Sequence, residues 1–250
     1  MAKITGILKL EGSIDNLIFY KSTSGYLVRK RGGIAPERIA NDSAFARTRE
    51  NNVEFGAVAS AGKLLRDALR GVTVKAVTGR AIPQITQLMS QIKNLDMQSA
   101  RGLRTVGVGI VTPEGKAMLK ALNLNIHSTL ESVLYKPFTA DAVTGKIEMK
   151  GMVAATDVKY PAGATHVRFK GGFATIDFVQ GSSELHLTNE VTIAVDQASV
   201  DITLMPQTVP AMTGGVRLVV FGIDFLQELN GLQYSMNNGS YNALTIVAVA

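Results

Sequence analysis

The hydrophobic period of this 250-residue chain changes near Lys136, and that change constrains the fold more than any other feature. Before it, apolar residues recur at the spacing typical of amphipathic helices. After it, short β-branched segments alternate with polar residues between Gly, Ser, Pro or Asn turns, as in an antiparallel sandwich or barrel. We therefore expect an α+β fold with two domains. Residues 1–135 form a basic β-hairpin and helical region, and residues 136–250 form an antiparallel β-domain.

The helical region contains two segments with clear signals. Thr112, Pro113 and Glu114 together form a standard helix start, with a capping hydroxyl, proline in the first turn and an acidic residue beside it. The stretch that follows Pro83 carries one apolar stripe, which predicts an amphipathic helix. Its members are Ile85, Leu88, Met89, Ile92 and Leu95.

The chain opens with a glycine-punctuated stretch, residues 6–33, which predicts two or three short strands joined by tight turns. Its apolar residues alternate with polar neighbours, as in a half-buried hairpin. A hairpin this short is marginal alone in water, so it must pack on its own helices or on a neighbouring chain. The alternating residues are Leu17, Phe19, Tyr26 and Val28.

Charge is distributed unevenly between the two predicted parts. Residues 1–135 carry 19 Lys and Arg against 10 Asp and Glu, whereas residues 136–250 carry 7 against 10. This asymmetry favours either an anionic partner for the first part or head-to-tail attraction between copies of the chain. Two domains with differently composed solvated faces would give the same counts.

The chain has no cysteine, which fits a protein made in the cytoplasm. Its N-terminus does not read as a secretory signal, and no apolar run reaches the ~18 residues that a membrane span needs. We expect cytoplasmic synthesis without a signal peptide, with the protein acting in a cell or as part of a phage-like or released particle.

No motif identifies a reaction. The stretch from Gly109 to Met118 has five residues between its glycines and an alanine where a phosphate-binding loop needs Ser or Thr, so we interpret it as a helix cap. The three histidines, His127, His166 and His186, have no metal-ligand spacing. No serine lies in a nucleophile elbow. We therefore expect no enzyme, no cofactor and no metal.

Two motifs carry a resemblance to a known group of proteins. The chain begins with a hairpin of the form GxIxNLxFYK…GYLVRxKGG, followed by a helix of the form RIxxDPAFxRTRENxxEFG, in which Ser43 takes the place of the usual proline. This pattern resembles an uncharacterised family of Bacteroidota, and the similarity extends to the segment from Phe225 to Leu244. The family brings no established activity. Shorter relatives of the hairpin resemble proteins of phage or prophage-like gene sets, which implies a structural role.

These observations predict a self-assembling structural protein, a subunit of a filamentous, tubular or virion-like assembly whose partner is another copy of itself. Unblocked strand edges favour such pairing, and head-to-tail contacts that do not close give filaments. Packing in the core of a single chain would equally explain the apolar residues that we expect at these contacts. The expected contacts are Leu17, Phe19, Tyr26 and Val28 in the hairpin, and Thr245, Val247 and Val249 in the final strand.

The alternative is a nucleic-acid-associated protein that binds phosphates through its basic half. Aromatic and cationic side chains together can track a phosphate backbone and stack on bases. Basic side chains that lie over an apolar hairpin would need no ligand. The residues of this alternative are Arg29, Lys30, Arg31, Arg47 and Arg49.

Overall fold

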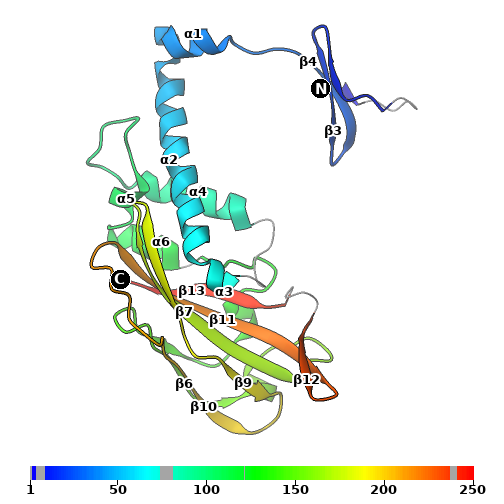
Figure 1. The fold of residues 1–250 in the computed structure, drawn as a ribbon, viewed down its shortest axis with the longest axis vertical. Helices are drawn as coiled ribbons and strands as arrows, with labels where there is room; N and C mark the ends of the chain where they lie inside the picture. The colour runs from blue at the N-terminus through cyan, green and yellow to red at the C-terminus, as the bar shows by residue number, and fades with distance from the viewer. Residues whose placement is uncertain (1, 4–8, 74–80, 121, 237–240) are drawn as a thin grey trace. The chain divides into compact units, whose positions relative to one another are not determined.

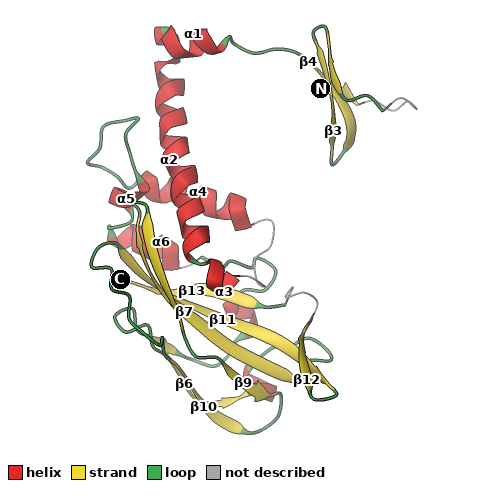
Figure 2. Ribbon diagram, in the orientation of Figure 1, coloured by secondary structure: helices red, strands yellow, loops and turns green. Residues whose placement is uncertain are grey.

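The computed structural model describes residues 2–3, 9–73, 81–120, 122–236 and 241–250. It confirms an α+β fold with a small antiparallel sheet near the N-terminus and a curled antiparallel sheet, a half-barrel, in the C-terminal part (Figures 1 and 2). The chain divides into two compact units, Met1–Glu50 and Asn51–Ala250. The limit expected after residue 135 therefore marks the change from helix to strand, because the helices before it share a core with the strands after it.

The first unit contains the N-terminal sheet, in the order β1-β4-β3-β2 with all pairs antiparallel. Asp15, at φ 50°, begins the turn between β2 and β3, where a short polar side chain tolerates positive φ. Helix α1 starts with proline, and the short helix η1 leads into α2, the helix that continues into the second unit. The bounds are β1 Ala2–Lys3, β2 Gly12–Ile14, β3 Leu17–Ser22, β4 Gly25–Lys30, α1 Pro36–Asn41, η1 Ser43–Phe45 and α2 Ala46–Ala68.

The helices of the second unit follow the sequence signals closely. The apolar stripe lies on α4, where Ile85, Met89 and Ile92 are buried. Thr112 caps α6 as predicted, since its hydroxyl accepts a hydrogen bond from the backbone N–H of Gly115 at 3.0 Å. The helices are α3 Arg70–Thr73, α4 Ala81–Lys93, α5 Val106–Gly109, α6 Pro113–Lys120, α7 Leu130–Val133 and α8 Ala154–Asp157.

The long strands β7 and β11 form the centre of the half-barrel and pair antiparallel along their length. Each has two shorter neighbours on its outer edge: β8 and β9 beside β7, and β12 and β13 beside β11. A separate three-stranded sheet has the order β10-β6-β5. The strands are β5 Thr139–Ala140, β6 Ile147–Val153, β7 His166–Asp177, β8 Ser182–Leu187, β9 Val191–Ala194, β10 Ser199–Leu204, β11 Val216–Leu229, β12 Leu232–Ser235 and β13 Ala243–Val249.

The half-barrel is covered on both faces, which gives the second unit two apolar clusters. Side chains such as Leu218 and Val220 alternate along β11, and those on one face pack against α2, α4 and α6. Phe221 and Ile223 belong to the opposite cluster, which also contains residues of β6 and β10. Figure 1 shows the same order of layers, with the helices on one side of β7 and β11 and the small sheet on the other. Double burial explains why β13 is apolar on both faces.

Candidate functional site

The two faces of the N-terminal sheet follow from its register. Phe19 lies opposite Val28, Leu17 opposite Lys30, and Lys21 opposite Tyr26. Directly opposed residues of antiparallel strands share a face, so the four predicted hairpin contacts lie together. We call this the Phe19 face, and it consists of Ile14, Leu17, Phe19, Lys21, Tyr26, Val28 and Lys30.

The opposite face of this sheet is apolar as well. Ile18, Tyr20 and Leu27 project from it, and Arg29 extends over the Tyr20 ring at 5.7 Å from the ring centroid. We call it the Tyr20 face. A sheet that is apolar on both faces needs a covering layer on each side to remove its side chains from water.

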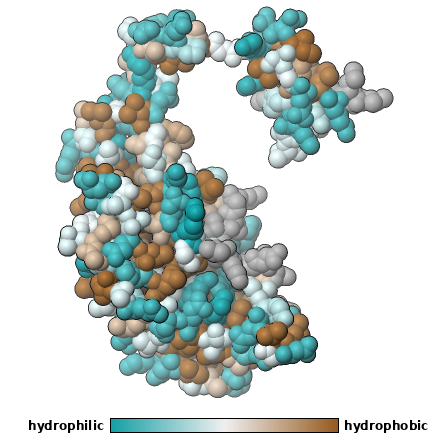
Figure 3. Space-filling view, viewed as in Figure 1, coloured by the Kyte–Doolittle hydropathy of each residue, from teal (hydrophilic) through white to brown (hydrophobic). Residues whose placement is uncertain are grey.

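No residue from position 9 to position 50 is buried in the described structure. Ile14 is 56% exposed and Leu17 is 43% exposed, while Phe19, Tyr26 and Val28 are half-buried. Apolar residues lie at the surface of this sheet in Figure 3. Burial of apolar area is the main driving force of folding, and residues 9–50 do not form the core that an independent sheet requires.

The five basic residues of the nucleic-acid alternative do not form one patch. Arg29 belongs to the Tyr20 face and Lys30 to the Phe19 face, because neighbouring residues in a strand point to opposite sides. Arg31 follows β4, and its backbone N–H donates to the carbonyl of Asn16. The basic run of the sequence is therefore divided between two surfaces.

Arg49 and Arg47 have intrachain partners. The Arg49 guanidinium donates to the carbonyl oxygens of Ile39 at 2.8 Å and Asp42 at 2.9 Å. It thereby adds a side-chain donor at the end of α1, where the Asp42 carbonyl also accepts from Phe45 N–H of η1. Arg47 lies 3.7 Å from Glu50 in an exposed ion pair. Sequence reasoning missed the role of Arg49 because its acceptors are backbone atoms, which leave no pattern in residue types.

The final strand, β13, is largely buried inside the second unit. Thr245 and Val247 are each only 8% exposed, and Val249 packs against the helix-side cluster. One edge of β13 pairs with β11. Along the other edge, Leu124 N–H donates to Leu244 at 2.8 Å, and Ile246 N–H donates to Leu122 at 3.1 Å. Residues of the same chain thus pair with positions 244–246 on that edge, and contact of the final strand with another copy stays a prediction.

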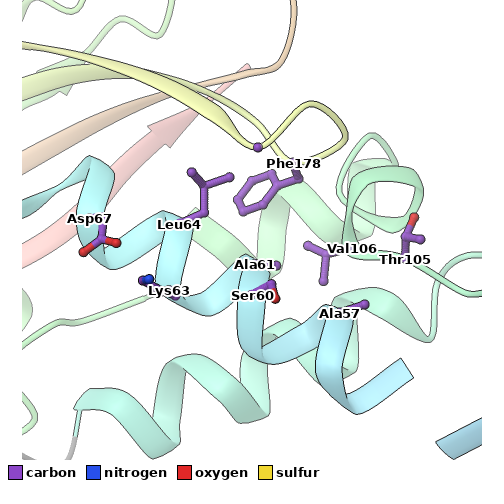
Figure 4. Close-up of a pocket in the computed structure, with 10 residues that line it drawn as sticks. Ala57, Ser60, Ala61, Lys63, Leu64, Asp67, Thr105, Val106 and Phe178 are labelled. Atoms are coloured by element: carbon purple, nitrogen blue, oxygen red, sulfur yellow. The ribbon is translucent and has the colours of Figure 1, made fainter. Parts of the chain in front are cut away.

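A groove of about 540 Å³ lies in the second unit (Figure 4). Leu64 and Phe178 approach each other across it, and Ala61 and Val106 lie in its floor. The groove contains no histidine, and the Thr105 hydroxyl already accepts from Val108 N–H as the cap of α5. This lining suits binding of an apolar group. Its residues are Ala57, Ser60, Ala61, Lys63, Leu64, Asp67, Thr105, Val106, Phe178 and Gly181.

A buried ionic network fixes the loop between α4 and α5. Glu54 accepts from Lys93 Nζ at 2.5 Å and from Gly102 N–H at 2.8 Å, and Arg104 Nε lies 3.4 Å away. The Lys93 hydrogen bond is the main cause that lowers the Glu54 pKa. Burial alone would raise the pKa of Asp96, but hydrogen bonds from the backbone N–H groups of Thr105, Ser99 and Gln98 outweigh it and lower the pKa to about 2.

Two further polar groups lie on the strands, and neither was visible in the sequence. The His186 ring is hydrogen-bonded to the Glu184 carboxylate at 2.6 Å, and this bond is the main cause that lowers the Glu184 pKa. His186 also contacts the Thr208 hydroxyl. Asp224 is fully buried beneath Arg168 at 2.9 Å and Lys170 at 2.7 Å. Asp224 is 54 or more positions from its two partners, and the register of β7 and β11 brings them together. Thr208 follows β10 and is 22 positions from His186.

Within the described ranges, no group of three or more acidic or histidine side chains is arranged to hold a metal ion. None of the helices in those ranges combines the length and apolar character required to cross a membrane. Comparisons with protein-family models, with curated proteins and with solved structures give no match to this chain, so its function has to be inferred from its own geometry.

Proposed function

We propose that the protein is a non-enzymatic structural subunit that assembles with copies of itself into a filamentous, tubular or virion-like particle. The observation that carries the proposal is the N-terminal sheet, which is apolar on both faces and has no buried residue between positions 9 and 50. Another copy of the chain supplies the missing layers. Three polar contacts of the second unit join segments that are distant or separated by a loop: Gly102 N–H to Glu54, Thr105 N–H to Asp96, and Arg168 to Asp224. These groups serve packing.

Charge supports self-association. Residues 1–135 carry 19 Lys and Arg against 10 Asp and Glu, whereas residues 136–250 carry 7 against 10. A basic region and an acidic region on one chain attract each other between copies and speed their encounter. The division of Arg29 and Lys30 between two faces, and the intrachain bonds of Arg49, weaken the nucleic-acid alternative.

The test is light scattering coupled to size-exclusion chromatography, followed by electron microscopy of the same fractions. We expect regular particles from the natural chain and a monomer from the Leu17→Asp/Phe19→Asp variant, because a carboxylate on the Phe19 face opposes its burial. Val143→Asp is the matched control, since Val143 is 63% exposed in a turn of the second unit. It should leave the particles unchanged.

A natural chain that stays monomeric at all concentrations would overturn the proposal. A monomer that carries absorbance at 260 nm would instead favour the nucleic-acid alternative. Its affinity should then fall steeply with salt, with a slope set by the number of phosphates contacted.

A further inference from the structure

The strand edges of this chain differ in how they are protected from pairing with another chain. One edge of β13 is covered by residues 122–124. The outer side of β8 meets the segment that contains Pro206, through a bridge from Thr188 and the contact of Thr208 with His186. β10 has an irregular register near Val200 and an exposed aspartate in its centre. Covering segments, proline, bulges and charge are the usual devices that block edge pairing.

β12 has none of these devices within the described residues. It pairs with β11 on one side, and its sequence, Leu-Gln-Tyr-Ser, has no charge and no proline. The hairpin turn that leads into it has positive φ at both Asn230 (53°) and Gly231 (79°), which fits a tight two-residue connection. Leu229 lies opposite Leu232 on one face of the hairpin. Leu232 is 60% exposed and Tyr234 is 52% exposed.

β2, at the other end of the chain, has the same properties. It pairs with β3 on one side only among the described residues, and its sequence is Gly-Ser-Ile. Ile14 belongs to the Phe19 face. Both edge strands are thus short and uncharged, and both adjoin an exposed apolar face.

We infer that β2 of one copy pairs with β12 of the next, so that the N-terminal sheet extends the half-barrel of its neighbour. This inference rests on the proposed function and names its receptor surface. Backbone N–H and C=O groups on the two edges supply the hydrogen bonds, and the apolar side chains of the Phe19 face continue the surface of Leu232 and Tyr234. The two surfaces of the chain are different, so the contact is head-to-tail and propagates into a filament or ring.

The size and charge of the two surfaces fit this occupant. Strands of three and four residues bury less than the roughly 1,200 Å² of a stable interface, so the apolar faces have to contribute and assembly has to depend on concentration. Glu228 is directly opposite Gln233 of β12, so it lies on the face of that hairpin away from Leu232 and Tyr234. When the Phe19 face continues Leu232 and Tyr234, this other face meets the Tyr20 face, which carries Arg29. The basic side chain of Arg29 therefore lies on the same side of the joined sheet as the carboxylate of Glu228.

The absence of cysteine makes the pairing directly measurable. Ser13→Cys in full-length chain is mixed with a second full-length variant that carries one cysteine at position 232, 233, 234 or 235 in turn. Opposed residues of paired strands come close enough for a disulfide, so mild oxidation should cross-link Ser13→Cys to at least one of the four. Val143→Cys is the control second variant and should give at least tenfold less product.

A second variant tests the contact without cross-linking. Leu232→Lys/Tyr234→Lys places charge on the exposed edge and should abolish the particles while circular dichroism stays unchanged. Particles that persist in this variant, or that form with no Ser13 cross-link to β12, overturn the inference but leave the proposed function standing. A Tyr234→Cys chain that cross-links efficiently to itself indicates a two-fold β12 pair and also overturns it. A natural chain that never assembles would overturn the proposed function itself, which is a different outcome from the failure of this inference.

Discussion

The N-terminal sheet and the half-barrel have the same local design and opposite environments. In both, antiparallel strands carry apolar side chains on both faces: Phe19 and Tyr20 in β3, and Phe173 and Ala174 in β7. Phe173 and Ala174 are fully buried because helices cover one face and the small sheet covers the other. The described residues of the first unit provide no such layers for Phe19 and Tyr20. Strand pattern therefore specifies what has to be buried, and the covering layer decides whether the chain buries it alone.

The largest expected effect is the difference in stability loss when one phenylalanine in each sheet is replaced by alanine. Phe173→Ala should lower the free energy of unfolding by about 3–5 kcal/mol, because it opens a cavity at a site with no exposure. Phe19→Ala should lower it by less than about 1 kcal/mol in dilute protein, since its ring is half-buried. Urea unfolding followed by circular dichroism measures both. Equal losses would show that Phe19 is already in a core within one chain.

A second substitution compares the ion pairs of the two units. Glu54→Leu leaves the Lys93 ammonium buried without its carboxylate, which should cost about 3 kcal/mol of stability. Arg47→Ala removes an exposed pair and should change stability by no more than about 0.5 kcal/mol. The double variant Glu54→Leu/Lys93→Met should regain most of the loss, because no buried charge remains from that pair. A double variant as unstable as Glu54→Leu would contradict this account.

The smallest expected effect is a loss of folding stability at acidic pH. The Asp96 pKa is about 2 in the folded chain against an ordinary 3.8, so the folded state binds this proton less readily than the unfolded state. The stability from Asp96 is therefore present above pH ~4 and is lost as the pH falls towards 2. Unfolding measured across this range should show a slope that Asp96→Asn reduces. A variant with the same slope as the natural chain would show that other carboxylates cause it.

Local rules predicted the parts of the fold that depend on neighbours in sequence. The stripe on α4, the Thr112 cap and the shared face of Leu17, Phe19, Tyr26 and Val28 all follow from helix or strand periodicity and capping chemistry. Periodicity and capping chemistry did not predict the two compact units, Met1–Glu50 and Asn51–Ala250. A change of hydrophobic period reports where helix gives way to strand, whereas a compact unit depends on which elements pack together.

The long-range contacts were beyond sequence reasoning for the same physical reason. Apolar residues on both faces of the final strand fit either a central strand or a strand that meets another chain. The choice depends on residues 122–124, which lie about 120 positions earlier in the chain and pair with Leu244 and Ile246. The Asp224 pairs with Arg168 and Lys170 likewise depend on strand register, and the Arg49 bonds depend on backbone carbonyls.

The covered edge of β13 has a consequence for how the protein fails under stress. The strand Ala-Leu-Thr-Ile-Val-Ala-Val has high β-propensity, no charge and no proline, which are the features of a segment that nucleates amyloid-like stacking. Residues 122–124 keep that segment out of reach in the folded chain. Heating or a loosened α6 would release it, and the expected product is an irreversible aggregate instead of the ordered particle.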